Sequence, residues 1–135
     1  MLELEMMKLG TEYLSRQCQF HQIKEEVPFL SRCIDAVLLD RSDNLISIEF
    51  KISKWRQAIE QAKNHKLGSD KAYICLPERK LTETLTQAIL EAGVGLFFFS
   101  PNAVEVVYEV IPAPKINQNI TVFREMLLKN ISKIN

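Results

Sequence analysis

Along the chain, segments whose apolar residues have the spacing typical of helices alternate with segments whose apolar pattern is typical of strands. Residues 33–39 and 45–52 are apolar segments joined by the sequence DRSDN, which is rich in turn-forming residues. They predict an antiparallel hairpin. Residues 2–17 predict a helix, because apolar side chains recur there at spacings of three and four. The residues expected on one face of this helix are Leu2, Met6, Leu9, Tyr13 and Leu14.

The remaining segments continue the two patterns, with proline or glycine at several of their ends. We expect Pro28 and Pro77 to follow or close strands, and Gly68 and Gly93 to stop helices. In chain order, the predicted elements are a strand over 19–25, a helix over 54–66, a strand over 71–77, a helix over 82–92, strands over 95–100 and 103–110, and a helix over 120–134.

The order of these elements predicts an α/β fold: helix, three strands, helix, strand, helix, two strands, helix. A helix connects the second strand of the hairpin to strand 71–77, so these two strands should be parallel. The sheet is then mixed, with helices on its faces. A length of 135 residues with 47% hydrophobic content predicts a single domain over residues 1–135 with a substantial core.

The charge balance and the cysteines limit the partners and the compartment. Basic and acidic residues number 17 each, so the net charge of zero provides no general attraction to nucleic acid or membrane. Any nucleic-acid site must be a local patch. Cys18, Cys33 and Cys75 lie in apolar surroundings without metal-ligand spacing, which predicts reduced core thiols. With no signal-peptide pattern and no apolar run long enough to span a bilayer, we expect a cytoplasmic protein without membrane contact.

Three charged residues lie inside the predicted hairpin strands. Side chains alternate along a strand, so Glu49 and Lys51 should share one face, opposite to the core side. A turn centred on residue 42 would place Asp35 opposite Glu49. Two facing carboxylates repel, so they require positive charge between them. Mg²⁺, or Mn²⁺ in its place, suits such a pair because magnesium binds through one or two carboxylates, water and phosphate oxygens.

These residues resemble the D...ExK signature of the PD-(D/E)xK nuclease superfamily, which has the restriction-endonuclease-like fold. The layout around them, over residues 10–77, is similar to that of archaeal Holliday-junction resolvases. The resemblance implies that Asp35 and Glu49 are metal ligands, that the carbonyl of Phe50 is a third, and that Lys51 is the catalytic lysine. It also implies that Glu12, on the first helix, is an auxiliary acid.

The helix after the ExK strand adds candidate substrate-binding residues. Some relatives place a glutamine of this helix near the site, which points to Gln57 or Gln61. Lys54, Trp55 and Arg56 form a basic cluster with an aromatic ring that could meet a phosphate and a base. Equally, Trp55 could anchor the start of the helix by packing on the sheet.

Two departures from the resolvase pattern stand close to Asp35. Ile34 occupies the place of the signature's proline, and KEEVPFLSR, over 24–32, replaces a basic stretch rich in glycine and serine. His21 invites a catalytic interpretation, but a lone histidine predicts a surface or packed side chain.

The sequence therefore predicts a metal-dependent nuclease that hydrolyses phosphodiester bonds in DNA, with a homodimer suggested by the resemblance. An alternative is a non-catalytic nucleic-acid- or protein-binding module that keeps the nuclease fold. For Glu49 and Lys51, the plainer interpretation is a surface ion pair on a solvated sheet face. A third interpretation is a structural α/β protein whose function lies in its C-terminal hairpin and helix.

Overall fold

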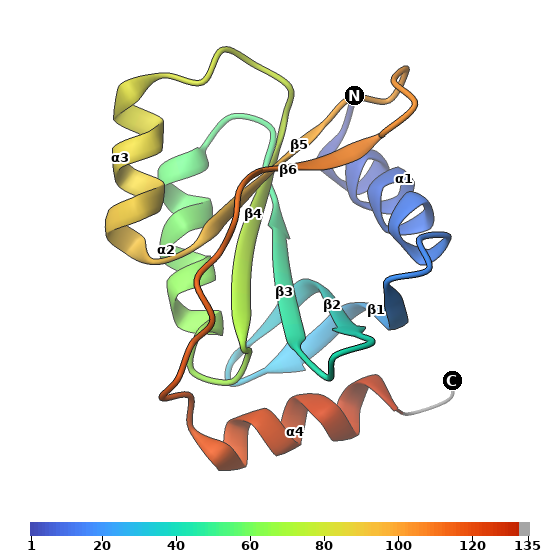
Figure 1. Ribbon diagram of the computed structural model, residues 1–135, viewed down its shortest axis with the longest axis vertical. Helices are drawn as coiled ribbons and strands as arrows, with labels where there is room; N and C mark the ends of the chain where they lie inside the picture. The colour runs from blue at the N-terminus through green and yellow to red at the C-terminus, as the bar shows by residue number, and fades with distance from the viewer. Residues whose placement is uncertain (133–135) are drawn as a thin grey trace.

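The computed structural model describes residues 1–132, which fold into a mixed sheet covered by helices on both faces (Figure 1). The sheet has six strands in the order β1-β2-β3-β4-β5-β6. The elements in chain order are α1 (Glu3–Ser15), β1 (Phe20–Phe29), β2 (Arg32–Asp40), β3 (Leu45–Phe50), α2 (Trp55–His65), β4 (Lys71–Pro77), α3 (Glu83–Ala92), β5 (Gly95–Phe99), β6 (Val107–Ile111) and α4 (Thr121–Ile131).

The strand pairing confirms the predicted fold class. Strands β1, β2 and β3 pair antiparallel, β3, β4 and β5 pair parallel, and β6 returns antiparallel to β5. Helices α2 and α3 are the two crossover connections between the parallel strands, as such connections require. The element order is the predicted one, helix by helix and strand by strand.

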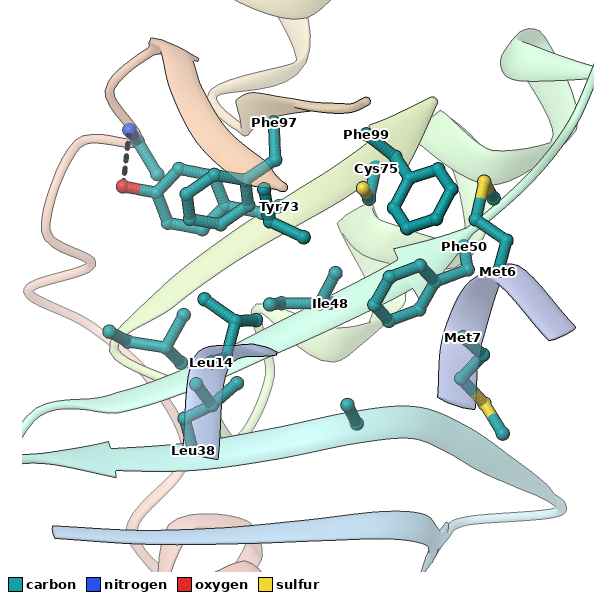
Figure 2. Close-up of a cluster of buried hydrophobic side chains, with 14 residues drawn as sticks. Met6, Met7, Leu14, Leu38, Ile48, Phe50, Tyr73, Cys75, Phe97 and Phe99 are labelled. Carbon is teal, nitrogen blue, oxygen red and sulfur yellow. Dashed lines mark hydrogen bonds between the residues drawn. The ribbon is translucent and has the colours of Figure 1, made fainter. Parts of the chain in front are cut away.

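Helices cover the two faces of the sheet unequally. In Figure 1, α1 lies on one face, α2 and α3 lie side by side on the other, and α4 runs past the end of the sheet near β1. Figure 2 shows the core beneath α1, where Met6 and Leu14 of the helix meet Leu38, Ile48 and Phe50 of the sheet. A second cluster fills the space under α2 and α3, and a third lies under α4. Both faces are therefore packed.

The buried face of α1 differs from the predicted one. Leu2 and Leu9 are exposed, whereas Met7, Gly10 and Thr11 are buried together with Met6 and Leu14. The helix is rotated so that its smallest residue meets the sheet: a Cβ on Gly10 would lie 2.9 Å from Cε1 of Phe50. Met6 and Leu14 are buried as predicted and Tyr13 packs against the core, but Leu2 and Leu9 are not on the buried face, because spacing alone does not show how closely the helix approaches the sheet.

Strand β1 continues beyond the proline that was expected to end it. It extends through Pro28 to Phe29 and pairs with β2 down to Arg32. Proline lacks an N–H donor, but β1 is an edge strand with only one neighbour, so the missing donor interrupts no second ladder. At the other edge, β6 begins at Val107 rather than at residue 103.

Two of the three cysteines are not in the core. Cys18 and Cys33 are exposed and only Cys75 is buried, so the prediction of core thiols was wrong for the first two. Burial raises the pKa of the Cys75 thiol far above its ordinary value, which keeps it protonated. No helix within residues 1–132 combines the length and the apolar character needed to cross a membrane.

Gly95, at the start of β5, has no room for a side chain. A Cβ there would lie 2.3 Å from Cε2 of Tyr73 and 2.7 Å from the backbone nitrogen of Ala113. Tyr73 cannot move aside, because its ring stacks on Phe97 with centroids 4.3 Å apart and its hydroxyl accepts a hydrogen bond from the Ala113 N–H. We expect Gly95→Ala to lower the free energy of unfolding by about 2 kcal/mol, measured by urea denaturation. A loss no larger than that of Gly93→Asn, at a half-buried left-handed position, would contradict this account of the contact.

Candidate functional site

The site lies where β2 and β3 diverge, at the end of the hairpin away from its turn. The paired residues run from Leu39 opposite Leu45 to Ala36 opposite Ile48. This register is centred on residue 42, as predicted. Extended by one position, it places Asp35 opposite Glu49.

At that position side chains replace the backbone ladder. The N–H of Phe50 donates to Oδ2 of Asp35 at 2.9 Å, and the N–H of Asp35 donates to Oε1 of Glu49 at 3.3 Å. Each carboxylate is thus fixed by a backbone donor from the opposite strand. These cross-strand bonds hold the two acidic groups against one another.

The regular alternation of β2 breaks at Asp35. Ala36 packs in the core under α1, whereas Ile34, two residues earlier, packs in the core under α4. In an uninterrupted strand these two side chains would share a face. On the neighbouring strand β1, Glu26 adopts a left-handed backbone conformation with φ 52° between the pairs Glu25–Ala36 and Val27–Ile34. The distortion of both strands turns Asp35 out of the ordinary sheet pattern.

Burial makes this pair of carboxylates electrostatically unfavourable. Glu49 is only 4% exposed, and burial, followed by the charge of Asp35, raises its pKa to about 8. Burial also raises the pKa of Asp35, although its bond from the Phe50 N–H, its bond with Glu49 and the charge of Lys51 oppose the shift. At neutral pH the two groups cannot both be ionised without compensation.

The burial of Glu49 excludes the surface-ion-pair interpretation for this residue. The expectation that Glu49 lies on a face of β3 away from the core was also wrong. Ser47, on the same face as Glu49, is fully buried. Every residue of β3 is buried because helices and strands pack on both sides of it.

Lys51 follows directly on the last residue of β3. Its N–H donates to the carbonyl of Cys75 at 3.0 Å, so the backbone continues the parallel pairing with β4. Its side chain is half-buried, and its charge lowers the pKa of both Asp35 and Glu49. The acidic pair and the lysine therefore share one electrostatic site.

The first helix supplies Glu3 rather than Glu12. Oε1 of Glu3 accepts a hydrogen bond from the Ile52 N–H at 3.0 Å, and its charge contributes to raising the pKa of Asp35. Glu12 lies nine residues after Glu3 along α1, where it is exposed and forms an ion pair with Arg16 at 2.5 Å. At 1.5 Å per residue this separation is roughly 13 Å. The placement of Glu12 at the site was therefore wrong.

Two contacts explain why α1 brings its first turn to this place. Lys8 forms an ion pair with Glu25 of β1 at 2.7 Å, and the hydroxyl of Thr11 donates to the same carboxylate. With Glu3 bonded beyond the end of β3, the helix is fixed at its first turn and near its middle. The sequence pattern identified the helix but could not fix its rotation or its offset along the sheet.

Helix α2 presents a row of polar side chains to the site. Gln57, Gln61 and His65 recur every four residues, and all three line a cavity that Glu49 also lines. Nε2 of His65 lies 3.8 Å from Oε1 of Glu49. Burial lowers the pKa of His65 to about 4, so the imidazole is neutral at neutral pH. His65 was missed in the sequence, although its four-residue spacing from Gln61 was a usable signal.

The basic cluster at the start of α2 faces elsewhere. Trp55 packs against the core under α2 and α3, as in the anchoring interpretation, and the guanidinium carbon of Arg56 lies 4.2 Å from the centre of its ring. Arg56 lines a surface hollow with residues of α3. Lys54 is exposed at the N-cap of α2. His21 is exposed at the opposite end of β1 from Glu26, near the Phe20–Asp40 pair, in agreement with the plain interpretation.

The available donors fit a hard cation with a small protein ligand set. Across residues 1–132, no three side chains of His, Cys, Asp or Glu converge as metal ligands. Asp35 and Glu49 provide two carboxylates, and the carbonyl of Phe50 lies between Glu49 and Lys51 in the chain. Two carboxylates completed by a carbonyl and water match magnesium better than zinc, which prefers nitrogen and sulfur ligands.

No protein-family model and no curated protein matches the chain. Among solved structures, it is similar to a protein of unknown function from Silicibacter pomeroyi, with a TM-score of 0.70 and 19% identity over 98% of this chain and 85% of that one. It is also similar to a repair endonuclease from Pyrococcus abyssi, with a TM-score of 0.51 and 19% identity over 75% of this chain and 48% of the endonuclease.

These similarities concern the fold. The chain is a mixed α/β protein whose six-stranded sheet and flanking helices are consistent with a nuclease-like core. The matched part amounts to about half the length of the endonuclease. A shared fold at this identity does not transfer an activity, so only the residues of the site bear on function.

Proposed function

We propose that this protein is a metal-dependent nuclease of the PD-(D/E)xK type, which hydrolyses phosphodiester bonds in DNA. One observation supports the proposal above all others: the buried carboxylate of Glu49 and the half-buried carboxylate of Asp35 are held against each other beside Lys51 at the end of the hairpin. A protein gains no stability from burying two like charges. A cation bound between the two carboxylates would compensate for their repulsion.

In this proposal Asp35, Glu49 and the carbonyl of Phe50 hold Mg²⁺ or Mn²⁺. When bound, the ion supplies charge neutralisation at the phosphoryl oxygen and lowers the pKa of water. Lys51 orients the attacking water or stabilises the charge that develops on the phosphate. Glu3 positions Lys51 and Ile52 at the end of β3. The neutral His65 lies beside Glu49 on the α2 side, with Nε2 3.8 Å from Oε1.

A cleavage assay tests the proposal. Labelled single-stranded, duplex and four-way-junction DNA is incubated with the wild type and with Glu49→Ala, in magnesium, manganese or chelator. We expect metal-dependent cutting by the wild type, reduced by about 10³-fold or more in the variant. Cutting that survives the substitution would exclude this site as its source.

A non-catalytic nucleic-acid- or protein-binding module that keeps the nuclease fold is the second candidate. The zero net charge gives the chain no general affinity for a polyanion, which weighs against a tight, sequence-independent DNA binder. The same panel separates the two candidates when binding is measured beside cleavage. Specific binding of one substrate without cutting in any metal would favour the module.

Two of the three glutamates of α1, Glu3 and Glu12, provide a matched comparison. Glu3→Gln removes a charge beside Asp35 but keeps an oxygen that can accept from the Ile52 N–H. We expect a cleavage rate lower by about tenfold. Glu12→Gln, on the exposed part of the helix, should leave the rate unchanged. The opposite ranking would restore Glu12 as the auxiliary acid and contradict the placement of α1.

A further inference from the structure

A cavity of about 550 Å³ adjoins the carboxylate pair on the side of Glu49. One wall is the turn between β1 and β2, from Phe29 to Cys33, and the opposite wall is the polar face of α2. Glu49 lines it, so the cavity and the proposed reaction centre share a residue. The volume exceeds what a single planar ring needs and is within the range of ordinary ligand sites.

Two polar atoms in the residues that line this cavity are buried without a hydrogen-bond partner. They are Oε1 of Gln61 and Nδ1 of His65, and the His65 side chain is only 7% exposed. Most buried polar atoms in proteins are paired, and an exception requires a reason. The amide oxygen can only accept a hydrogen bond, whereas an imidazole nitrogen can accept or donate. A fitting ligand must therefore carry an N–H or O–H donor beside a second polar atom.

The lip of the cavity carries an exposed apolar side chain on an unusual backbone. Leu30, at the tip of the β1–β2 turn, is 51% exposed and has φ 57°, a left-handed conformation that side-chain-bearing residues rarely adopt. Both features are unfavourable for an ordinary turn residue. Such an exception, located at the edge of a cavity, is a reason to look for function. Together with Phe29 and Leu67, Leu30 adds apolar surface to a cavity whose other lining side chains are mostly polar or charged.

We propose that this cavity holds one unpaired nucleobase next to the phosphate that the carboxylate pair attacks. A base is planar and apolar on its faces, and its edge carries adjacent donors and acceptors. The apolar lip contacts the face of the base, while Gln61 and His65 bind its edge. The exposed Arg32, on the same wall, meets the neighbouring backbone phosphate. The inference rests on the proposed nuclease function and narrows its substrate class.

A base inside the cavity cannot be paired with another strand at the same time. The substrate is therefore single-stranded nucleic acid, or a strand end or damaged position where a base is already unstacked, rather than intact duplex. Insertion of a base from an intact duplex would require unpairing and unstacking.

Fluorescence anisotropy tests this inference without depending on cleavage. The probes are a labelled single strand, the same sequence closed into a blunt hairpin, and the single strand with every base replaced by an abasic sugar, all in chelator. We expect the single strand to bind at least roughly tenfold more tightly than the other two probes. Gln61→Leu removes the amide oxygen and should lose that advantage. Leu30→Gly relaxes the backbone, so it should keep the fold and weaken only the base-containing strand.

Gln87→Leu, an exposed glutamine on α3, is the matched control and should bind as the wild type does. Thermal melting shows whether each variant is folded. Equal affinity for normal and abasic strands would overturn the inference, as would a Gln61→Leu variant that still prefers the normal strand. If the protein cuts DNA but binds normal and abasic strands equally, the inference about the cavity fails and the nuclease proposal is unaffected. Base-dependent binding without any cutting would support the cavity and refute the nuclease.

Discussion

Glu49→Gln is expected to make the protein more stable in chelator and inactive in magnesium. The amide keeps an oxygen that can accept from the Asp35 N–H, and its NH₂ group can donate to the Asp35 carboxylate. Because the pKa of Glu49 rises to about 8 on folding, the carboxyl must take up a proton at neutral pH, and the amide avoids that cost while keeping a hydrogen bond of similar shape. We expect the free energy of unfolding to rise by about 1–2 kcal/mol and the melting temperature by roughly 3–8 °C. Cleavage should fall by about 10³-fold or more, as for Glu49→Ala.

Stability is expected to rise while cleavage falls, whereas general damage to the fold would lower both. Asp35→Asn should behave in the same way, because its side-chain oxygen can still accept from the Phe50 N–H. Glu125→Gln, an exposed acid on α4, should change neither property. Differential scanning calorimetry in chelator gives the stability, and the DNA panel gives the activity. A Glu49→Gln protein that is less stable than the wild type would mean that the carboxylate pair is a structural support.

Arg124→Ala is expected to have the largest effect on stability among the substitutions considered. Nη2 and Nε of Arg124 donate to the carboxylate of Asp70, and Nη2 also donates to the carbonyl of Asp43. Asp70 in turn accepts from the Leu45 N–H at 2.8 Å and from Asn119. Its side chain is 7% exposed, so removal of the arginine leaves a buried, uncompensated charge. We expect a loss of about 3 kcal/mol in urea denaturation.

The same pair predicts a dependence on pH. Burial would raise the pKa of Asp70, but the hydrogen bonds from Arg124 and the Leu45 N–H outweigh burial, and the pKa lies below its ordinary value of 3.8. The unfolded chain therefore binds a proton more readily than the folded one. The stabilisation is complete well above pH 3.8 and is lost as the pH falls through the lower, folded-state pKa.

Urea denaturation of wild type and Arg124→Ala at several pH values checks this sign. The difference in stability between the two proteins should be largest near neutral pH and should shrink below about pH 4. Arg56→Ala, which removes an exposed arginine stacked on Trp55, is the matched control and should change stability by less than about 1 kcal/mol. A difference that stays constant between neutral and acid pH would contradict the account of Asp70.

Local patterns predicted much of the fold because they reflect forces that act within a few residues. The DRSDN turn and the apolar segments around it defined the β2–β3 register, and the intervening helix required β3 and β4 to be parallel. The position of Asp35 opposite Glu49 followed from that register alone. Pro28 misled the prediction, because its effect depends on whether a strand has one neighbour or two, which is a property of the whole sheet.

The parts of the site that sequence did not provide depend on how elements dock. Glu3 reaches Ile52 because α1 is fixed to Glu25 of β1, and this offset is set by contacts between residues far apart in the chain. The burial of Glu49 likewise results from packing on both faces of β3. The exposure of Cys33 arises at the β1–β2 turn, which the predicted end of β1 at residue 25 did not include.

We propose that the carboxylates of Asp35 and Glu49 bind a divalent cation. Isothermal titration of Mn²⁺ into the wild type, Glu49→Gln and Glu125→Gln tests it most directly, since it requires no substrate. We predict saturable binding to the wild type and to Glu125→Gln, with the heat of binding lost in Glu49→Gln. Equal binding by all three proteins, or binding by none of them, would contradict the claim.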